Sequence, residues 1–526
     1  MELNIRGFNA SPATICLCIG IPLAACLFLV SNLPSLRLQT VLQGGRANQP
    51  GGWMGGNTQV LRRAYGTPIR TVPGPWYAKL TQLWLKKHTL AGRRMHYVHS
   101  LHEKYGPVVR ISPSEIDVSD PAAFKIIHRI NSGFLKSPWY ASFRTGDTRD
   151  LFSMTNPKQH AERRKLFAPV FSNSALRKNW HGEVAGKVAV AVGKIKADAA
   201  TNGGGEVDIF KWWTYMATDV ISQLAFGEAF GMLEQGKKTK PMQKIEESIK
   251  FGLISSELPL LCRILQWVPL KAVQDMVNAN ELVQAHAEAT MRRVRHDSLG
   301  ASNIFSRIVA EQEKGGGRLS DYDVAFEAGG FIVAGSGTTA VTLTYLVWAV
   351  LSRPAVQARL ESEVAGLEDG FTDVDLEKLP YLSAVIEETL RLYGAAPGAL
   401  PRTVPHGGAT LGEYFIPEGT TVSTQAYTLH RDKASYAEPE RFAPDRFLSA
   451  TGEFQPTQAV FCPFGAGSRT CVGMHLAFME LRHGVAQFFR ECKGARLSAK
   501  TTPASMDMAN YFLIGPAADQ CWVTLG

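Results

Sequence analysis

Residues 464–473 read FGAGSRTCVG, a glycine-rich loop that ends near Cys471 and precedes an apolar helical pattern over residues 474–489. A cysteine at the N-terminus of a helix has a lowered thiol pKa, because the helix dipole and the free backbone N–H groups favour the thiolate. Arg469 adds a cation two residues before the cysteine, which suits a ligand with an acidic edge. The loop therefore predicts a reactive or metal-binding thiolate at Cys471.

Three kinds of site could use such a thiolate, and the sequence excludes one of them. A zinc site needs three or four protein ligands, so a lone thiolate is not a zinc site. A catalytic nucleophile is an alternative, although no cysteine-protease signature accompanies Cys471. The thiolate could also ligate one large metal cofactor axially, and haem is the obvious candidate.

The composition of the 526-residue chain excludes several other classes of protein. With 45% apolar and 20% charged residues, the chain is not mainly disordered. Its 48 glycines follow no Gly-X-Y period, which excludes collagen, and eight cysteines are too few for a disulfide scaffold. The net charge of +9 favours anionic surfaces, but no zinc-finger or RNA-recognition signature is present, so we expect no nucleic-acid partner.

The N-terminal segment predicts a membrane anchor. No residue between 8 and 36 is charged, and residues 14–30 read TICLCIGIPLAACLFLV. About 20 helical residues span a bilayer core, so we assign residues 1–36 to a tail and an anchor helix at about 13–33. A cleaved signal peptide is the alternative. Several arginines follow the segment, and the positive-inside rule then places the bulk of the chain in the cytosol.

Residues 37–75 form the next predicted unit, a Gly- and Pro-rich linker that ends in the stiff turn Pro73-Gly74-Pro75. Residues 76–526 follow as one catalytic domain with a mostly helical pattern. Residues 110–112 and 116–118 are strand candidates.

Residues 320–352 predict one unusually long helix of roughly 48 Å, with Ser320 as its N-cap. In its middle, residues 334–339 read AGSGTT. Two glycines at that place cost about 2 kcal/mol of helix propensity. Either a ligand lies against this exposed backbone, or a neighbouring helix packs closely on the glycines.

These segments together resemble one family. The loop at 464–473 fits the pattern F-x-x-G-x-R-x-C-x-G, and four other segments fit further motifs in the same order along the chain. They are 160–164 (HAERR, for W-x-x-x-R, with His in place of Trp), 334–339 (AGSGTT, for A-G-x-D/E-T-T, with Gly in place of the acid), 388–391 (ETLR, for E-x-x-R) and 442–447 (FAPDRF, for F-x-P-E-R-F, with Asp in place of Glu). The chain thus resembles the cytochrome P450 superfamily of haem-thiolate monooxygenases, of the eukaryotic microsomal and filamentous-fungal type, over about residues 70–525.

The resemblance implies a fold and a location. We expect a mainly α protein with small β-sheets, the cytochrome P450 fold, in which a triangular helical prism surrounds one haem. A single transmembrane helix precedes it. The implied location is the endoplasmic reticulum membrane, with one membrane pass and a cytosolic catalytic domain.

The resemblance also assigns roles to particular residues. Cys471 is the implied axial ligand of the haem iron, and its thiolate donates electron density that promotes O–O cleavage. Phe464 packs near the sulfur, and Gly473 lets backbone N–H groups approach it. The implied partners of the haem propionates are His160, Arg164, Arg402 and Arg469. A buried charge triad of Glu388, Arg391 and Arg446 has a structural role.

The oxygen-site motif contains one departure from the family pattern. Ala334, Gly335, Gly337 and Thr338 belong to the implied catalytic segment. Thr338 matches the threonine that hydrogen-bonds the oxygen molecule and steers its protonation. The preceding position is usually acidic, and here it is Gly337. We therefore hypothesise that the substrate or a water chain delivers protons, with more uncoupling to peroxide than in relatives that have the acid.

The implied function is a membrane-anchored monooxygenase that hydroxylates, epoxidises or further oxidises a lipophilic small molecule, as in fungal secondary metabolism. It uses haem b, O2 and NADPH electrons from a separate cytochrome P450 reductase, with cytochrome b5 as a further candidate donor, because no flavin domain or dinucleotide fingerprint is present. We expect substrate contacts from residues 132–150 and 251–267, and contact of residues 258–267 with membrane lipid. The alternatives are a haem-thiolate isomerase, dehydratase or peroxide-using enzyme without NADPH, and, more remotely, a non-catalytic haem protein.

Overall fold

The computed structural model describes residues 61, 64–143, 150–202, 204–239, 320–457 and 459–526, with isolated positions between 242 and 308. The predicted anchor helix at about 13–33 and most of the predicted linker lie outside the described residues. Most of the predicted substrate-contacting segment 251–267 lies outside them as well.

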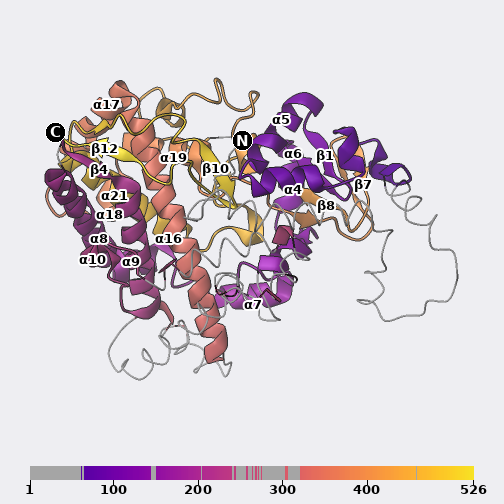
Figure 1. Ribbon diagram of the computed structural model, residues 1–526, viewed down its shortest axis with the longest axis horizontal. Coiled ribbons are helices and arrows are strands. Elements are labelled where there is room, and N and C mark those ends of the chain that lie inside the picture. The colour runs from indigo at the N-terminus through magenta and orange to yellow at the C-terminus, as the bar shows by residue number, and fades with distance from the viewer. Residues whose placement is uncertain are drawn as a thin grey trace.

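The described chain is mainly helical, as predicted (Figure 1). Its α-helices are α4 (Leu83–Leu90), α5 (Arg94–Tyr105), α6 (Pro121–His128), α7 (Pro157–Phe167), α8 (Asn173–Thr201), α9 (Ile209–Phe226), α10 (Met232–Gln235), α16 (Asp321–Leu351), α17 (Pro354–Ala365), α18 (Asp373–Glu377), α19 (Pro380–Tyr393), α20 (Ala426–Leu429) and α21 (Met474–Glu491). Short 3-10 helices are η2 (Pro68–Arg70), η3 (Trp76–Lys79), η4 (Pro138–Phe143), η5 (Pro444–Phe447) and η6 (Gly467–Arg469).

Within the described residues, the strands form four small sheets. The largest has the order β1-β2-β8-β5-β3, with only the β2–β8 pair parallel. Its strands are β1 (Val108–Ser112), β2 (Glu115–Val118), β3 (Leu135–Lys136), β5 (Arg402–Thr403) and β8 (Thr421–Ser423). The smaller sheets are β6–β7 (Ala409–Leu411 and Tyr414–Ile416), β10–β11 (Met508–Tyr511 and Leu513–Pro516) and β4-β12-β9 (Glu206–Asp208, Trp522–Thr524 and Arg496–Leu497). Both strand candidates from the sequence are confirmed as parts of β1 and β2.

Helix α16 is the long helix that the sequence predicts. It is capped by a box in which the Ser320 hydroxyl accepts from the Asp323 N–H while the Asp323 carboxylate accepts from the Ser320 N–H. Figure 1 shows α16 running through the molecule, with α8, α9 and α21 on one side of it. Residues 326–351 are long and apolar enough to cross a membrane, but 61% of their most apolar window is buried inside the fold. The stretch is therefore a core helix.

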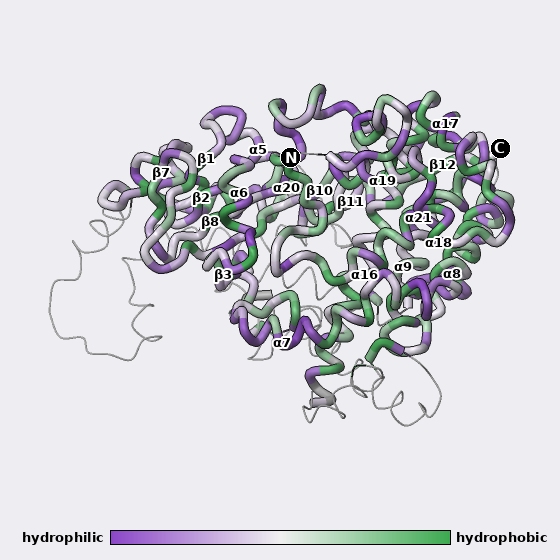
Figure 2. The backbone as a smooth tube through the Cα atoms, turned by 180° about the vertical axis from the view of Figure 1, so that it is seen from behind, coloured by the Kyte–Doolittle hydropathy of each residue, from purple (hydrophilic) through white to green (hydrophobic). Residues whose placement is uncertain are grey.

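The hydrophobic core follows from this central position. The apolar segments of α9 and α16 lie close together in the helical half of the molecule (Figure 2), and both belong to the largest buried cluster. The AGSGTT segment does not interrupt α16, which is helical throughout. At Gly335 an added Cβ would lie 2.8 Å from the Cγ1 of Ile221 on α9, so close helix packing explains this glycine.

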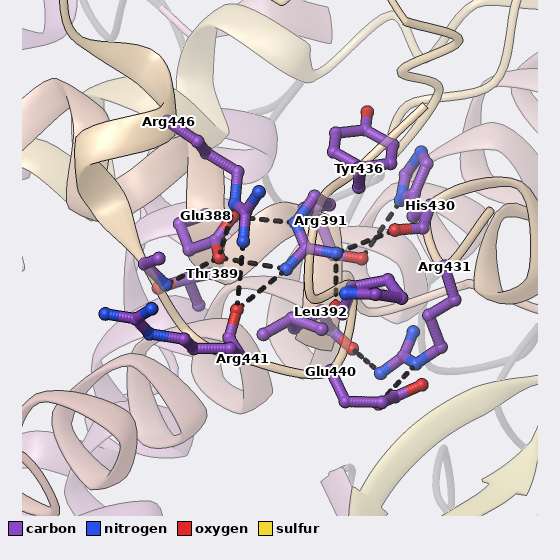
Figure 3. A network of polar contacts seen from close by, with 12 residues as sticks. Glu388, Thr389, Arg391, Leu392, His430, Arg431, Tyr436, Glu440, Arg441 and Arg446 are labelled. Atoms are coloured by element: carbon purple, nitrogen blue, oxygen red, sulfur yellow. Dashed lines mark hydrogen bonds and ion pairs between the residues drawn. The ribbon is translucent and has the colours of Figure 1, made fainter. Parts of the chain in front are cut away.

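A buried ionic network joins α19 to the segment that precedes the cysteine loop (Figure 3). The Glu388 carboxylate accepts hydrogen bonds from Arg391 at 2.7 and 2.9 Å and from the Arg446 Nε at 3.0 Å. It also accepts the Ala443 N–H at 2.7 Å. Arg391 and Glu388 have no exposed side-chain surface. The two arginines and the backbone donor together compensate the buried carboxylate, which alone would be costly.

The same network continues toward the cysteine loop. Arg391 donates to the backbone oxygen of His430 at 2.7 Å, and the His430 Nδ1 donates to the Arg391 oxygen at 3.0 Å. The His430 Nε2 then accepts the Cys462 N–H at 2.9 Å, which requires the neutral tautomer. Burial lowers the pKa of His430 to about 3, in agreement with a neutral ring. The Cys462 oxygen accepts the Gly465 N–H at 3.0 Å, inside the loop itself.

Breaking this network should destabilise the protein strongly. We expect Arg391→Met to lower the free energy of unfolding by about 3–5 kcal/mol, because the Glu388 carboxylate would stay buried without its main partner. Thermal and urea denaturation of the solubilised full chain measure the change. The control is Arg93→Met, which breaks the exposed pair with Asp507 and should cost at most about 1 kcal/mol. Equal losses in the two variants would contradict this assignment.

Candidate active site

The cysteine loop has a fixed backbone that leads into α21. The Cys471 N–H donates to the Phe464 oxygen at 2.9 Å, and the Thr470 hydroxyl donates to the Gly467 oxygen at 2.9 Å. Gly467 has φ +66°, and an added Cβ would lie 1.9 Å from the His128 oxygen. Only glycine fits there, because the backbone of residue 128 presses against the loop.

Cys471 is exposed, whereas the other three cysteines of the described residues are buried. Its side chain is nonetheless densely surrounded by protein, and this burial raises the pKa of the thiol. The hydrogen bond from Gly473 and the charge of Arg164 both lower the pKa, but they do not outweigh the burial. The predicted lowering of the pKa is therefore wrong for the chain alone. A bound metal cation would supply the missing stabilisation, since it deprotonates a coordinating thiol.

Three arginines from distant parts of the chain lie near this loop. Arg164 of α7 donates to the Thr470 oxygen at 2.7 Å, and Arg469 donates to the Met154 oxygen at 2.8 Å. Arg402 of β5 is 5% exposed. Burial, followed by the charge of Arg402, lowers the pKa of Arg469 to about 10. None of the three arginines forms an ion pair with a carboxylate of the described residues, so they form a positive cluster that suits an anionic ligand.

His160 lies one turn before Arg164 on α7, whose N-terminus is capped by Asn156. Its ring is 4% exposed. Burial, with a contribution from Arg469 and the other nearby cations, lowers the pKa of His160 to about 3. A neutral imidazole can hold a carboxylate by a hydrogen bond but not by charge.

Lys136 joins the same positive cluster, and sequence reasoning missed it. It lies on β3 directly opposite Arg402 on β5, so two cations face each other across an antiparallel pair. Its Nζ lies 4.0 Å from the ring centroid of Tyr140 and donates to the Phe152 oxygen. Burial and the charge of Arg402 lower the pKa of Lys136 well below its usual value. No local motif marks this lysine, because only strand pairing places it beside Arg402.

The middle of α16 has one face that protein does not cover. Ala334 is exposed and Thr338 is half-buried, although both lie midway along a helix whose other faces are buried. The Thr338 hydroxyl donates to the Ala334 oxygen at 2.7 Å. Gly337 faces the β10–β11 hairpin, where an added Cβ would lie 3.3 Å from the Leu513 Cδ1.

A buried acid lies beside this helix. Glu480 of α21 is 1% exposed and hydrogen-bonds the side chain of Thr339. Burial raises its pKa well above the usual range, which favours the neutral acid. Sequence reasoning missed Glu480, because only the packing of α21 on α16 brings it next to Thr339.

Phe464 lies at the start of the loop, where its backbone oxygen accepts the Cys471 N–H and its ring packs against Phe478 at 5.3 Å. The residues present therefore fit a haem. They provide one accessible thiol ligand, backbone donors beside it and three arginines that no carboxylate of the described residues neutralises. In the described part of the chain, no group of three or more His, Cys, Asp or Glu side chains gathers as metal ligands, so Cys471 would be the single protein ligand.

Comparison with known proteins agrees with this geometry. Residues 71–520 match the sequence model of the family described as Cytochrome P450. The chain is a cytochrome P450. It is 42% identical over 477 residues to the cytochrome P450 monooxygenase stcB of Emericella nidulans, an alignment that covers 89% of this chain and 90% of that protein. It is 42% identical over 470 residues to the cytochrome P450 monooxygenase tazI of Aspergillus terreus, with 88% and 95% covered. The methylphloroacetophenone oxidase of Cladonia uncialis is 34% identical over 397 residues, with 73% and 87% covered.

These similarities show that the chain is a cytochrome P450 monooxygenase of the fungal type, a family that holds its haem by a thiolate ligand. When bound, the haem supplies the activation of O2. Cys471 would be its ligand, and Arg164, Arg402 and Arg469 would hold its anionic edge.

Replacing Arg402 and Arg469, which form no ion pair with a described carboxylate, should weaken haem retention. For the double variant Arg402→Gln and Arg469→Gln we expect roughly ten- to hundredfold faster haem loss, because two charge-assisted hydrogen bonds to the ligand would be lost. Transfer of haem to excess apomyoglobin measures the rate. The control is Lys165→Gln, an exposed cation on α7 that should leave the rate unchanged. A double variant that retains haem as long as the unmodified protein would show that the arginines do not hold it.

Proposed function

We propose that this cytochrome P450 is a monooxygenase of fungal secondary metabolism, anchored in the endoplasmic reticulum membrane, that oxidises a lipophilic small molecule. A separate NADPH–cytochrome P450 reductase supplies the electrons, with cytochrome b5 as a further candidate donor. The observation that carries the proposal is the accessible Cys471 thiol in one site with three arginines that pair with no carboxylate in the described part of the chain. The exposed Ala334–Thr338 face of α16 supports it.

The membrane association is supported by one described surface. Within the apolar segment 258–267, Ile264 is 50% exposed and Trp267 is 87% exposed. Such side chains are favoured at a membrane interface, where the indole has both an apolar and a polar environment. A lipophilic substrate could then enter from the lipid.

The substrate class is supported by the printed name of one relative. Methylphloroacetophenone is an aromatic ketone with several hydroxyl groups, and the protein of that name is 34% identical to this chain. We extend this chemistry to the present cytochrome P450 and propose a polyhydroxylated aromatic substrate.

Proton delivery is the step at which this chain departs from its family. The Thr338 hydroxyl donates to the Ala334 oxygen, so its lone pairs are available to accept a proton donor. Gly337 offers no acid. The nearby buried acid, Glu480, hydrogen-bonds Thr339. A substrate hydroxyl or a water chain therefore supplies the proton at Thr338.

Gly337→Asp tests this step. We expect a larger share of the consumed NADPH to appear as oxidised product, and less as peroxide, because the new carboxyl would relay protons to Thr338. Room exists, since the added Cβ would require the Leu513 side chain to shift by a few tenths of an ångström. The control is Gly337→Ala, which adds the same Cβ without an acid. Unchanged coupling in Gly337→Asp, or an equal change in both variants, would count against the hypothesis.

The activity itself is tested by spectroscopy and turnover. In microsomes, the reduced protein with carbon monoxide should show a strongly red-shifted Soret band, and Cys471→Ala should abolish that band. If the haem-loaded protein lacked the band, Cys471 would not be the iron ligand, and the monooxygenase assignment would be rejected with it. Product formation without NADPH would instead favour an isomerase, dehydratase or peroxide-using enzyme. Any turnover would exclude a non-catalytic haem protein.

A further inference from the structure

Two easily oxidised rings lie next to each other at the positive cluster. Tyr140 is buried and Trp139 is half-buried, and their ring centroids lie 5.1 Å apart at an interplanar angle of 80°. Indole and phenol rings lose an electron far more readily than a phenylalanine ring does. An electron vacancy that reaches this part of the chain would therefore settle on Trp139 or Tyr140.

Tyr140 is the member of the pair that lies closer to the cations. The Lys136 Nζ lies 4.0 Å from its ring centroid. Burial raises the pKa of Tyr140 to about 12, although the charges of Arg402 and Arg469 lower it. Because these two arginines would also hold the anionic edge of the haem, Tyr140 connects the haem site to Trp139. The same cations disfavour a positive charge on the phenol ring, so Tyr140 is a poor place for an electron vacancy to remain.

Trp139, in contrast, has a proton acceptor. Its indole N–H donates to the Glu257 carboxylate. Lys86 of α4 donates to the backbone oxygen of Glu257 and so fixes the position of this acid. Burial raises the pKa of Glu257, although Arg94, Lys86 and the Trp139 hydrogen bond lower it. An oxidised indole is a much stronger acid than a neutral one, and a carboxylate at its N–H accepts the proton directly.

Two other tryptophans of the described residues lack this combination. The Nε1 of Trp213 is buried without a hydrogen-bond partner, so an oxidised ring there could not pass on its proton. Trp76 is 72% exposed and packs against Tyr77, at the start of the catalytic domain. Trp76 would be the first target of an oxidant that diffuses in water, whereas Trp139 is the target of one that arises at the haem.

We propose that Trp139 is a redox-active residue that takes up oxidising equivalents from the haem when turnover is uncoupled, with Glu257 as its proton acceptor. Gly337 makes this need specific to the present chain, because less controlled protonation of oxygen gives more peroxide. The inference rests on the proposed function only in taking the haem as the place where the oxidising equivalents arise.

The electrons and protons of this step balance. Hydrogen peroxide takes two electrons from the haem and, with two protons from water, becomes two water molecules. One electron then passes from the Trp139 indole through Tyr140 to the haem, while the Nε1 proton passes to Glu257. The N–H bond breaks, an O–H bond forms on the carboxyl group, and a neutral tryptophanyl radical remains.

A small reductant completes the cycle. Trp139 and Glu257 both line a cavity of about 340 Å³, which gives a molecule of the size of ascorbate room to meet the indole. Ascorbate supplies the second electron that the haem requires. It then returns one electron to the radical, and the proton moves back from Glu257 to the indole nitrogen. Trp139 thereby spares the haem from oxidative loss.

Spin trapping in the unmodified protein tests the proposal. The haem-loaded full chain is mixed with hydrogen peroxide and a nitroso spin trap, which forms a C–N bond with a carbon-centred radical. Peptide mapping by mass spectrometry then locates the adduct. We expect the adduct on Trp139 and none on Trp76, although Trp76 is the more exposed ring. Absence of an adduct on Trp139 would overturn the proposal, and so would equal labelling of haem-free protein.

Variants separate the redox role from a structural one. Trp139→Phe keeps an aromatic ring and should lead to faster bleaching of the haem Soret band by peroxide. Glu257→Gln keeps a hydrogen-bond acceptor but no base, and it should cause loss of the adduct on Trp139. The control is Trp76→Phe, which should leave both readouts unchanged. Unaltered bleaching in Trp139→Phe, or an undiminished adduct in Glu257→Gln, would contradict the proposed role.

The outcome is independent of the test of the monooxygenase. A normal carbon monoxide band with NADPH turnover, but no adduct on Trp139, would reject this inference and leave the function standing. An adduct on Trp139 that depends on Glu257, in a haem-loaded protein without the band, would support the inference and reject the function.

Discussion

The buried carboxylate of Glu388 is the constraint on which the rest of the site depends. Two arginines and one backbone N–H compensate its charge. Removal of either arginine would leave the buried carboxylate with less compensation for its charge. Through Arg391 and the neutral ring of His430, the same hydrogen bonds reach the backbone at Cys462. The cysteine loop is thereby attached to α19 although about 80 residues separate Cys471 from Arg391 in the sequence.

The buried charges near Glu388 and those near Cys471 differ in whether an opposite charge pairs with them. In the Glu388 network each charge has a partner, so the network is structural and rigid. Around Cys471 the opposite holds, because Arg164, Arg402 and Arg469 are at least partly buried and no carboxylate of the described residues pairs with them. Uncompensated buried cations destabilise a folded chain, and they persist where a ligand supplies the negative charge. The positive cluster thus indicates a binding site, while the Glu388 network indicates a scaffold.

The glycines of the long helix α16 illustrate how one motif can have two physical causes. From the sequence, either close helix packing or a ligand against the backbone could explain them. Gly335 packs against Ile221 of α9, so its cause is helix packing. Gly337 instead faces the β10–β11 hairpin beside the uncovered surface at Thr338, where a side chain has room. The first glycine holds the core together, and the second changes the chemistry that the helix can offer.

The sequence by itself determined the helices α16 and α19 and the residues of the cysteine loop. The bounds of α16 and α19 follow from a Ser cap and from prolines, because capping and proline restrictions act within a few residues. Only the tertiary structure decided the pKa of Cys471, the position of Lys136 opposite Arg402, and the contact of Glu480 with Thr339. Burial and pairing between distant segments set all three, and neither leaves a pattern in neighbouring residues. The sequence therefore indicates which side chains carry the chemistry. Long-range packing sets the protonation and the surroundings of those side chains.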